Sequence, residues 1–165
     1  HRFLVLYYKI ASLYFGAGDP ARAIDYLHRI IQQRADLRSD LQCYARLLHL
    51  IAHYELGHFD LLEHLIKSVY RYMAQMESLG VVEEEVFRFL RKSFQLNTPA
   101  RLRSAFKLLK EKLEKQEHNP FERRSFMYLD IISWLESKVV GGTVQEVIRR
   151  RYERQSSLSR RPFAF

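Results

Sequence analysis

The sequence predicts an all-helical domain of antiparallel helix pairs, and three observations favour this fold class. Residues that interrupt helices are scarce, with 6 Gly and 4 Pro in 165 residues. The tetrapeptide DPAR at residues 19–22 returns as TPAR at 98–101, and each has the pattern of a helix start. Apolar residues recur at helical spacing around three turns that lie 39 and 40 residues apart. A repeat of about 40 residues made of helix pairs is typical of an α-solenoid.

About eight helices are expected, and most begin at a recognisable cap. Asp19 and Thr98 precede the prolines of the twin motifs, where a side-chain oxygen can accept a free backbone N–H. Asn119 precedes Pro120 in the same way, and Glu122 follows at the capping-box position. Further capping boxes are Ser39-x-x-Gln42 and Thr143-x-x-Glu146, and the acidic run Glu83–Glu85 suits the positive end of a helix that begins near Val82. The expected ranges are 2–17, 20–34, 40–56, 59–78, 82–96, 99–117, 120–139 and 144–155.

The first six helices pair into three units around the turn residues Gly18, Gly57 and Asn97. Positions five, nine and twelve after each turn are apolar, and so are positions three and seven before it, which places them on single helical faces. These columns are Ala23, Leu62 and Leu102; Leu27, Ile66 and Phe106; Ile30, Val69 and Leu109; Phe15, Tyr54 and Phe94; Ala11, Leu50 and Leu90. The last two helices, joined by Gly141-Gly142, are expected to form a fourth, irregular unit.

The first unit resembles a tetratricopeptide repeat. That family has, in order, an aromatic residue, a small residue, a Tyr, a turn Gly, an Ala and a bulky residue. The matching positions here are Tyr7, Ala11, Tyr14, Gly18, Ala23 and Leu27. The second unit keeps Gly57, Phe59 and Ile66, and the third keeps the apolar spacing. The later units have Leu in place of small residues, the family's terminal proline is missing, and the period is 39–40 rather than 34. The resemblance covers roughly residues 4–117 and implies a short right-handed solenoid in one domain, residues 1–155, with a flexible basic tail at 156–165.

The resemblance also implies a non-enzymatic scaffold that binds a protein or peptide. In that family the first helix of each pair lines a concave groove. Phe15, Tyr54 and Phe94 would form an aromatic ladder there, and aromatic side chains offer large contact area at little entropic cost. The alternative is that the ladder belongs to the core, or is covered by repeats of a longer parent chain. The full set carried over to the groove is Tyr8, Ser12, Phe15, Leu47, Tyr54, Glu55, Phe87, Arg91 and Phe94.

No catalytic signature is present, so the chain is predicted not to be an enzyme, and no cofactor or metal is expected. GxSxG, HExxH and Gly-rich phosphate loops are all missing. His49 and His53 are four residues apart, as zinc ligands often are, with His58 and His64 nearby. However, Leu50 stands where a zinc protease needs Glu, so partly buried structural histidines are expected instead.

The composition of the chain bears on the cellular compartment in which the protein is expected. Cys43 is the single cysteine, which excludes an internal disulfide and predicts a reducing, cytoplasmic compartment, with the thiol buried and inert. No apolar run approaches the roughly 18 residues needed to cross a bilayer. The chain begins at His1 rather than Met, so we expect a fragment of a longer chain or a trimmed one. The sequence gives no indication of the oligomeric state.

The basic character is concentrated in the last third, which holds 15 of the 27 Lys and Arg residues. In the helix at 144–155, Val144, Val147, Ile148 and Tyr152 share one face and are expected to pack, leaving the arginines in solvent. The alternative function is therefore a nucleic-acid-associated module that contacts phosphates through this end, and a solubilising chain end is as plausible. The basic set is Arg149, Arg150, Arg151, Arg154, Arg160 and Arg161.

Overall fold

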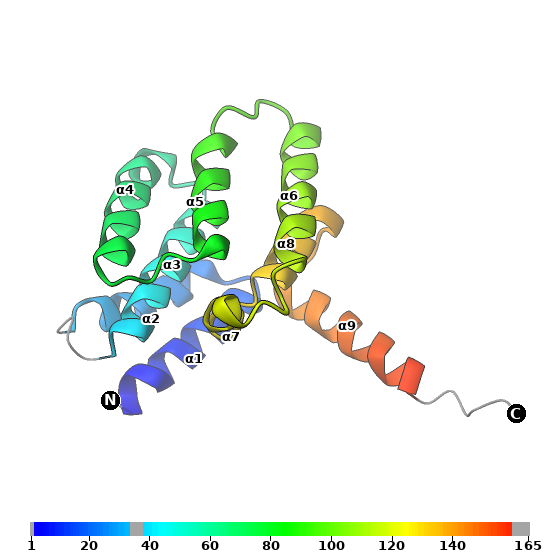
Figure 1. The fold of residues 1–165 in the computed structure, drawn as a ribbon, viewed down its shortest axis with the longest axis horizontal. Coiled ribbons are helices and arrows are strands. Elements are labelled where there is room, and N and C mark those ends of the chain that lie inside the picture. The colour runs from blue at the N-terminus through cyan, green and yellow to red at the C-terminus, as the bar shows by residue number, and fades with distance from the viewer. Residues whose placement is uncertain (1, 34–37, 160–165) are drawn as a thin grey trace, which may run out of the picture.

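Every regular element in the computed structural model is helical within the described ranges, residues 2–33 and 38–159 (Figure 1). Nine α-helices are present there rather than about eight. The elements are α1 (Arg2–Gly16), α2 (Pro20–Ile31), α3 (Ser39–Glu55), α4 (Phe59–Gln75), α5 (Val81–Ser93), α6 (Pro99–Glu114), the 3₁₀ turn η1 (Pro120–Glu122), α7 (Arg123–Tyr128), α8 (Ile131–Val140) and α9 (Val144–Ser159). None of these helices is long and apolar enough to cross a membrane.

Four of the predicted caps form, one of them at η1, where Asn119 accepts a hydrogen bond from the backbone N–H of Phe121 at 3.1 Å. Asp19 accepts a hydrogen bond from the backbone N–H of Arg22 at 3.1 Å, and Thr98 accepts one from that of Arg101 at 3.3 Å. The Thr143–Glu146 box forms in both directions, with bonds of 2.8 and 3.2 Å. These side chains satisfy N–H groups that no helical carbonyl reaches, and so they fix where α2, α6 and α9 begin.

The predicted capping box at Ser39 is wrong. Arg38 occupies the N-cap position of α3, in a left-handed conformation with φ of 55°. Gln42, the expected partner of Ser39, is fully buried and donates instead to the carbonyl of Ile30 at 2.8 Å. The NH₂ group of a buried amide needs an acceptor, and a carbonyl in the last turn of α2 provides one, so tertiary packing overrides the local pattern.

The single helix predicted at 120–139 is broken into η1, α7 and α8. Leu129 is extended, with φ of −120° and ψ of 121°, and its side chain is buried. Asp130 then caps α8 by accepting the backbone N–H of Ser133 at 3.2 Å. The buried leucine and the new cap together redirect the chain. At the C-terminal end, α9 continues to Ser159, so residues 156–159 of the predicted tail are helical.

The first two predicted turns share one geometry, and the third differs. Gly18 and Gly57 have positive φ, 85° and 69°. In each turn the glycine N–H bonds the carbonyl three residues back, and the next residue bonds the carbonyl five back. Asn97 does not have positive φ, and α5 ends at Ser93 with two bonds to carbonyls three residues back. Only the first two units therefore end their first helix in the same way.

Successive helices from α1 to α6 pack on one another, and the chain then turns back. Helices α4, α5 and α6 stand side by side, while α9 projects toward the C-terminus (Figure 1). Helix α8 packs on α6, and α9 packs on α8 and reaches α1. The core surrounds α3 and α8, which are buried on most sides. Four of the five predicted apolar columns contribute to it, since Ala11, Leu27, Leu50, Ile66 and Leu90 are all buried. The fifth column does not, because Phe94 is exposed and Phe15 and Tyr54 are half-buried.

Candidate partner-binding site

An apolar cavity of about 820 Å³ lies beside α1, between that helix, α3 and the segment from α7 to α9. Three of the predicted groove residues line it: Tyr8, Ser12 and Phe15. Leu13 and Met127 line it too and are 72% and 69% exposed, so the cavity opens to solvent between α1 and α7. Its volume falls in the range of ordinary ligand sites, and its lining is mostly apolar, as such sites usually are.

Helix α1 can line this cavity because it is apolar around most of its circumference. Leu4, Tyr8 and Ala11 recur at intervals of four and three and are buried. Ser12 follows Ala11 on an adjacent face, and its hydroxyl donates to the carbonyl of Tyr8 at 2.9 Å. This bond keeps the polar atom of Ser12 within its own helix, so that the wall remains largely apolar.

Tyrosine rings form the inner end of the cavity. The Tyr8 hydroxyl donates to the carbonyl oxygen of Tyr128 at 2.7 Å, and the two rings meet edge to face at 5.9 Å. The Tyr128 ring stacks on that of Tyr44 at 4.8 Å. Burial raises the pKa of Tyr8 far above its ordinary value, with Tyr44 and Tyr128 adding to the shift, so this phenol stays a neutral donor. It is an anchor between α1 and α7 rather than a titrating group.

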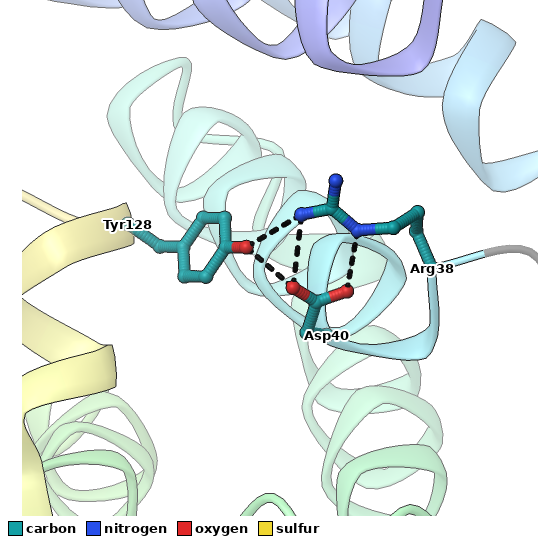
Figure 2. Close-up of polar contacts among 3 residues, drawn as sticks. All are labelled: Arg38, Asp40 and Tyr128. Atoms are coloured by element: carbon teal, nitrogen blue, oxygen red, sulfur yellow. Dashed lines mark hydrogen bonds and ion pairs between the residues drawn. The ribbon is translucent and has the colours of Figure 1, made fainter. Parts of the chain in front are cut away.

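Arg38, Asp40 and Tyr128 form a closed polar cluster beside the tyrosines (Figure 2). The guanidinium donates twice to Asp40 at 3.0 Å and once to the Tyr128 hydroxyl at 2.9 Å, and that hydroxyl donates to Asp40. The bond from Arg38 is the largest cause that holds the pKa of Asp40 well below its usual value. Each group is partnered by the other two, so the cluster joins the start of α3 to the end of α7.

Leu47 and Phe87 are fully buried, so their prediction as groove residues is wrong for this chain. Leu47 lies on α3, which neighbouring helices surround. Phe87 packs edge-on against Tyr70, at 5.2 Å between ring centroids. Arg91 is exposed, with its guanidinium 4.7 Å from the centroid of the same Tyr70 ring.

The aromatic ladder is divided between different environments. Phe15 is half-buried at the cavity, and Phe94 is exposed, with its ring 6.2 Å from that of Phe59. Tyr54 is half-buried between Phe106 and Trp134, each 6.4 Å away. The predicted continuous ladder is therefore interrupted at its middle by the chain's own residues.

The residues that sequence reasoning missed come from the returning segment, η1 to α8. Trp134 Nε1 donates to Glu55 at 2.6 Å, and Lys138 Nζ donates to the other oxygen of that carboxylate at 2.8 Å. Glu122, expected to cap its own helix, instead accepts the backbone N–H groups of Val81 and Val82 at 3.0 and 3.1 Å. The segment thus covers the ends of α3 and α5. The single Trp of the sequence is the one feature that marks this segment, and the sequence does not show that its partner is Glu55.

The histidines form a chain of contacts between α2, α3 and the start of α4. His53 Nδ1 lies 2.8 Å from His58 Nδ1, and His53 Nε2 lies 3.3 Å from His49 Nε2. The His28 ring is 6.3 Å from that of His49, while His64 is exposed on α4. Burial lowers the pKa of His49 to about 4 and also lowers that of His53, so both are neutral at pH 7. Across residues 2–33 and 38–159, no three His, Cys, Asp or Glu side chains are grouped to hold a metal ion.

The basic end of the chain is partly engaged with neighbouring residues. Val144 and Val147 are buried as predicted, whereas Ile148 and Tyr152 are exposed, which corrects the prediction that they pack. Arg149 pairs with Glu153 at 3.0 Å, and Arg151 donates to the hydroxyl of Ser133 at 3.2 Å. Arg149, Arg150 and Arg154 are exposed on α9, and Arg160 and Arg161 lie outside the described residues.

Comparison of the chain with protein-family models, curated proteins and solved structures finds no match in any of the three.

Proposed function

We propose that the chain is a non-enzymatic, tetratricopeptide-like solenoid scaffold that binds a protein partner in the cavity beside α1. The observation that carries the proposal is an apolar, solvent-open cavity on the first helix of the first predicted unit. That helix is where the resemblance places a groove. A single, buried Cys43 supports the further proposal of a reducing, cytoplasmic location.

The lining favours a peptide segment that inserts large apolar side chains. Aromatic rings of Tyr8, Phe15 and Trp134 lie toward the interior, and Leu13 and Met127 lie at the mouth. A few apolar anchors in a desolvated pocket supply most of the energy of a protein interface. Methionine at the rim adapts its shape to the inserted side chain. The fitting partner is therefore a peptide with two or three apolar anchors within about two helical turns.

Two substitutions at the mouth test the proposal. Leu13→Asp and Met127→Asp place charge in the cavity at positions exposed enough to keep the fold, and Leu61→Asp on α4 is the matched control. Affinity capture from nuclease-treated extract of the source cell, quantified by mass spectrometry, should recover one protein with the wild type and with the Leu61 variant. Both mouth variants should lose it. Equal recovery by all four proteins would rule out the cavity as the docking site.

A second candidate function, binding of nucleic acid, is favoured by the exposed arginines on α9. An RNA oligonucleotide would meet Arg149, Arg150 and Arg154 through its phosphates, with little dependence on base sequence. Replacing all three with Gln should reduce the slope of log affinity against log salt by up to about three, near one per phosphate contact. Absence of RNA and DNA binding by the intact protein at low salt would reject this candidate.

A further inference from the structure

A second hollow, of about 530 Å³, lies between α5 and α6, away from the cavity beside α1. Phe89, Ala105 and Leu109 form its apolar floor, and Phe89 and Leu109 are largely buried. Leu108 lies in the same hollow and is 66% exposed. An isolated exposed leucine is ordinary, but one set in an apolar cleft adds to a continuous docking surface.

The two helices are tied together at one end of this cleft. Glu85 on α5 bonds Lys112 on α6 at 2.8 Å and Arg88 on its own helix at 2.7 Å. Deeper in, the Phe89 ring contacts that of Phe106 at 4.7 Å. The opposite end is lined by Leu96, in the loop between α5 and α6, and by Arg101, in the first turn of α6. Figure 1 shows this loop joining the two helices. The cleft is therefore an antiparallel helix pair, fastened at one end and lined by apolar side chains along its length.

The rim of the cleft is strongly positive. Its lining holds four cations, Arg88, Lys92, Arg101 and Lys112, and one carboxylate, Glu85, whose side chain is only 13% exposed and already bonds two of them. The acids of α6 do not neutralise this rim. Glu111 and Glu114 pair with Lys107 and Lys110, none of which lines the cleft.

We propose that this cleft binds an acidic amphipathic helix of a protein partner. Apolar residues of that helix, at spacings of three and four, would fill the cleft over Phe89 and Leu108. Its flanking Glu and Asp residues would meet the cations of both rims. The 13 residues of α5 span about 20 Å, so a partner helix of about three to four turns matches the cleft. The apolar floor favours this occupant over nucleic acid, whose backbone would leave the leucines uncovered.

The test uses three fluorescein-labelled peptides of 14 residues and fluorescence anisotropy. The first is a helical peptide with Leu at positions 3, 7 and 10 and Glu on the flanks. The second has the same composition scrambled to remove the stripe, and the third has Lys in place of Glu. The first should bind at least about tenfold more tightly than either control, because only it combines stripe and charge.

Variants then locate the site. Leu108→Asp and Arg101→Glu should each weaken binding of the first peptide at least about tenfold, because one loses an apolar contact and the other reverses a rim charge. Arg103→Glu makes the same charge change on another face of α6 and should leave the affinity unchanged. Circular dichroism verifies that each variant is folded. Leu13→Asp, in the cavity beside α1, should also leave the affinity for the first peptide unchanged. The peptide test of the cleft is therefore independent of whether the cavity beside α1 binds a partner.

Three outcomes would overturn the proposal. Equal binding of the scrambled peptide would indicate attraction of any polyanion. No binding of the first peptide at protein concentrations up to about 1 mM would mean that the Kd exceeds this very weak value and that the cleft does not bind such a helix. Tighter binding of a single-stranded RNA of matched charge, lost in the Arg101 variant, would assign the cleft to nucleic acid instead.

Discussion

Replacing Glu122 with glutamine should destabilise the whole domain, although the residue lies in a short 3₁₀ turn. Glu122 is 4% exposed, and its carboxylate accepts hydrogen bonds from the backbone N–H groups of Val81 and Val82, the first two residues of α5. These N–H groups have no carbonyl partner within α5. Glutamine has nearly the same shape but one acceptor oxygen and no charge, so its NH₂ would face one of the two donors.

The expected loss follows from these contacts. A hydrogen bond to a charged group contributes about 1.5–3 kcal/mol, and a carboxylate at a helix N-terminus adds about 0.3–1 kcal/mol. Glu122→Gln should therefore lower the free energy of unfolding by about 2–4 kcal/mol. For a chain of this size each kcal/mol lowers Tm by about 2–4 °C, so Tm should fall by roughly 5–15 °C.

Urea unfolding followed by circular dichroism at 222 nm measures this effect. Glu117→Gln is the matched control, because it makes the same change at an exposed position shortly before the turn. It should stay within about 0.5 kcal/mol of wild type, as surface changes usually do. A loss of less than about 0.5 kcal/mol in Glu122→Gln would refute the cap. As a second check, a Cβ on Gly80 would lie 2.6 Å from a Glu122 oxygen, so Gly80→Ala should destabilise, and its effect should be non-additive with Glu122→Gln.

Three further predictions concern other polar side chains that are partly or fully buried. The pKa of His49 is about 4 in the folded chain and near 6.5 in the unfolded chain, so the unfolded chain binds a proton first as pH falls. The free energy of unfolding should therefore decrease between pH 6.5 and 4, by about 1.4 kcal/mol per pH unit for one proton. His49→Gln should reduce this pH dependence, as measured by urea unfolding. The lowered pKa of Asp40 contributes stability that is present above about pH 4 and lost below it. Asp40→Asn should therefore be less stable than wild type at pH 6, but its stability should fall less steeply as the pH drops below about 4. An unchanged fall in stability at acid pH would contradict this. Trp134→Phe removes the indole donor to Glu55 and should cost about 2–3 kcal/mol by thermal unfolding, whereas a change below about 0.5 kcal/mol would mean that the returning segment is not anchored there.

The parts of the fold that could be predicted from the sequence rest on local chemistry. Asp19, Thr98 and Thr143 cap helices because their partners lie three residues away in the chain. The buried columns follow helical periodicity, and Gly18 and Gly57 take the positive φ that a helix-ending turn needs. In each case the interacting groups lie within a few residues of each other, so the sequence pattern contains them.

The features that could not be predicted depend on contacts between distant residues. The side chain of Gln42 donates a hydrogen bond to a carbonyl of α2 rather than capping its own helix. Glu122 caps α5 by accepting backbone N–H groups that lie 40 and 41 residues before it in the chain. The resemblance places Leu47 in a groove because it lies on the first helix of its pair, but α3 is surrounded on most sides because the chain returns over it. Of the predicted groove, Tyr8, Ser12 and Phe15 line one cavity, and Phe15 also shares a smaller hollow with Glu55. Tyr54 packs against Trp134, and Leu47 and Phe87 are buried. Periodicity identifies an apolar face but not which segment covers it.

Site-specific photocrosslinking would detect a protein partner bound in the cavity beside α1. A photoreactive phenylalanine analogue would replace Leu13 or Met127 at the mouth of the cavity, or Leu61 on α4 as the control, in the cell from which the chain comes. Both mouth positions should give the same protein adduct, resistant to nuclease, and position 61 should give none. No adduct at either mouth position, or the same adducts at all three, would contradict it.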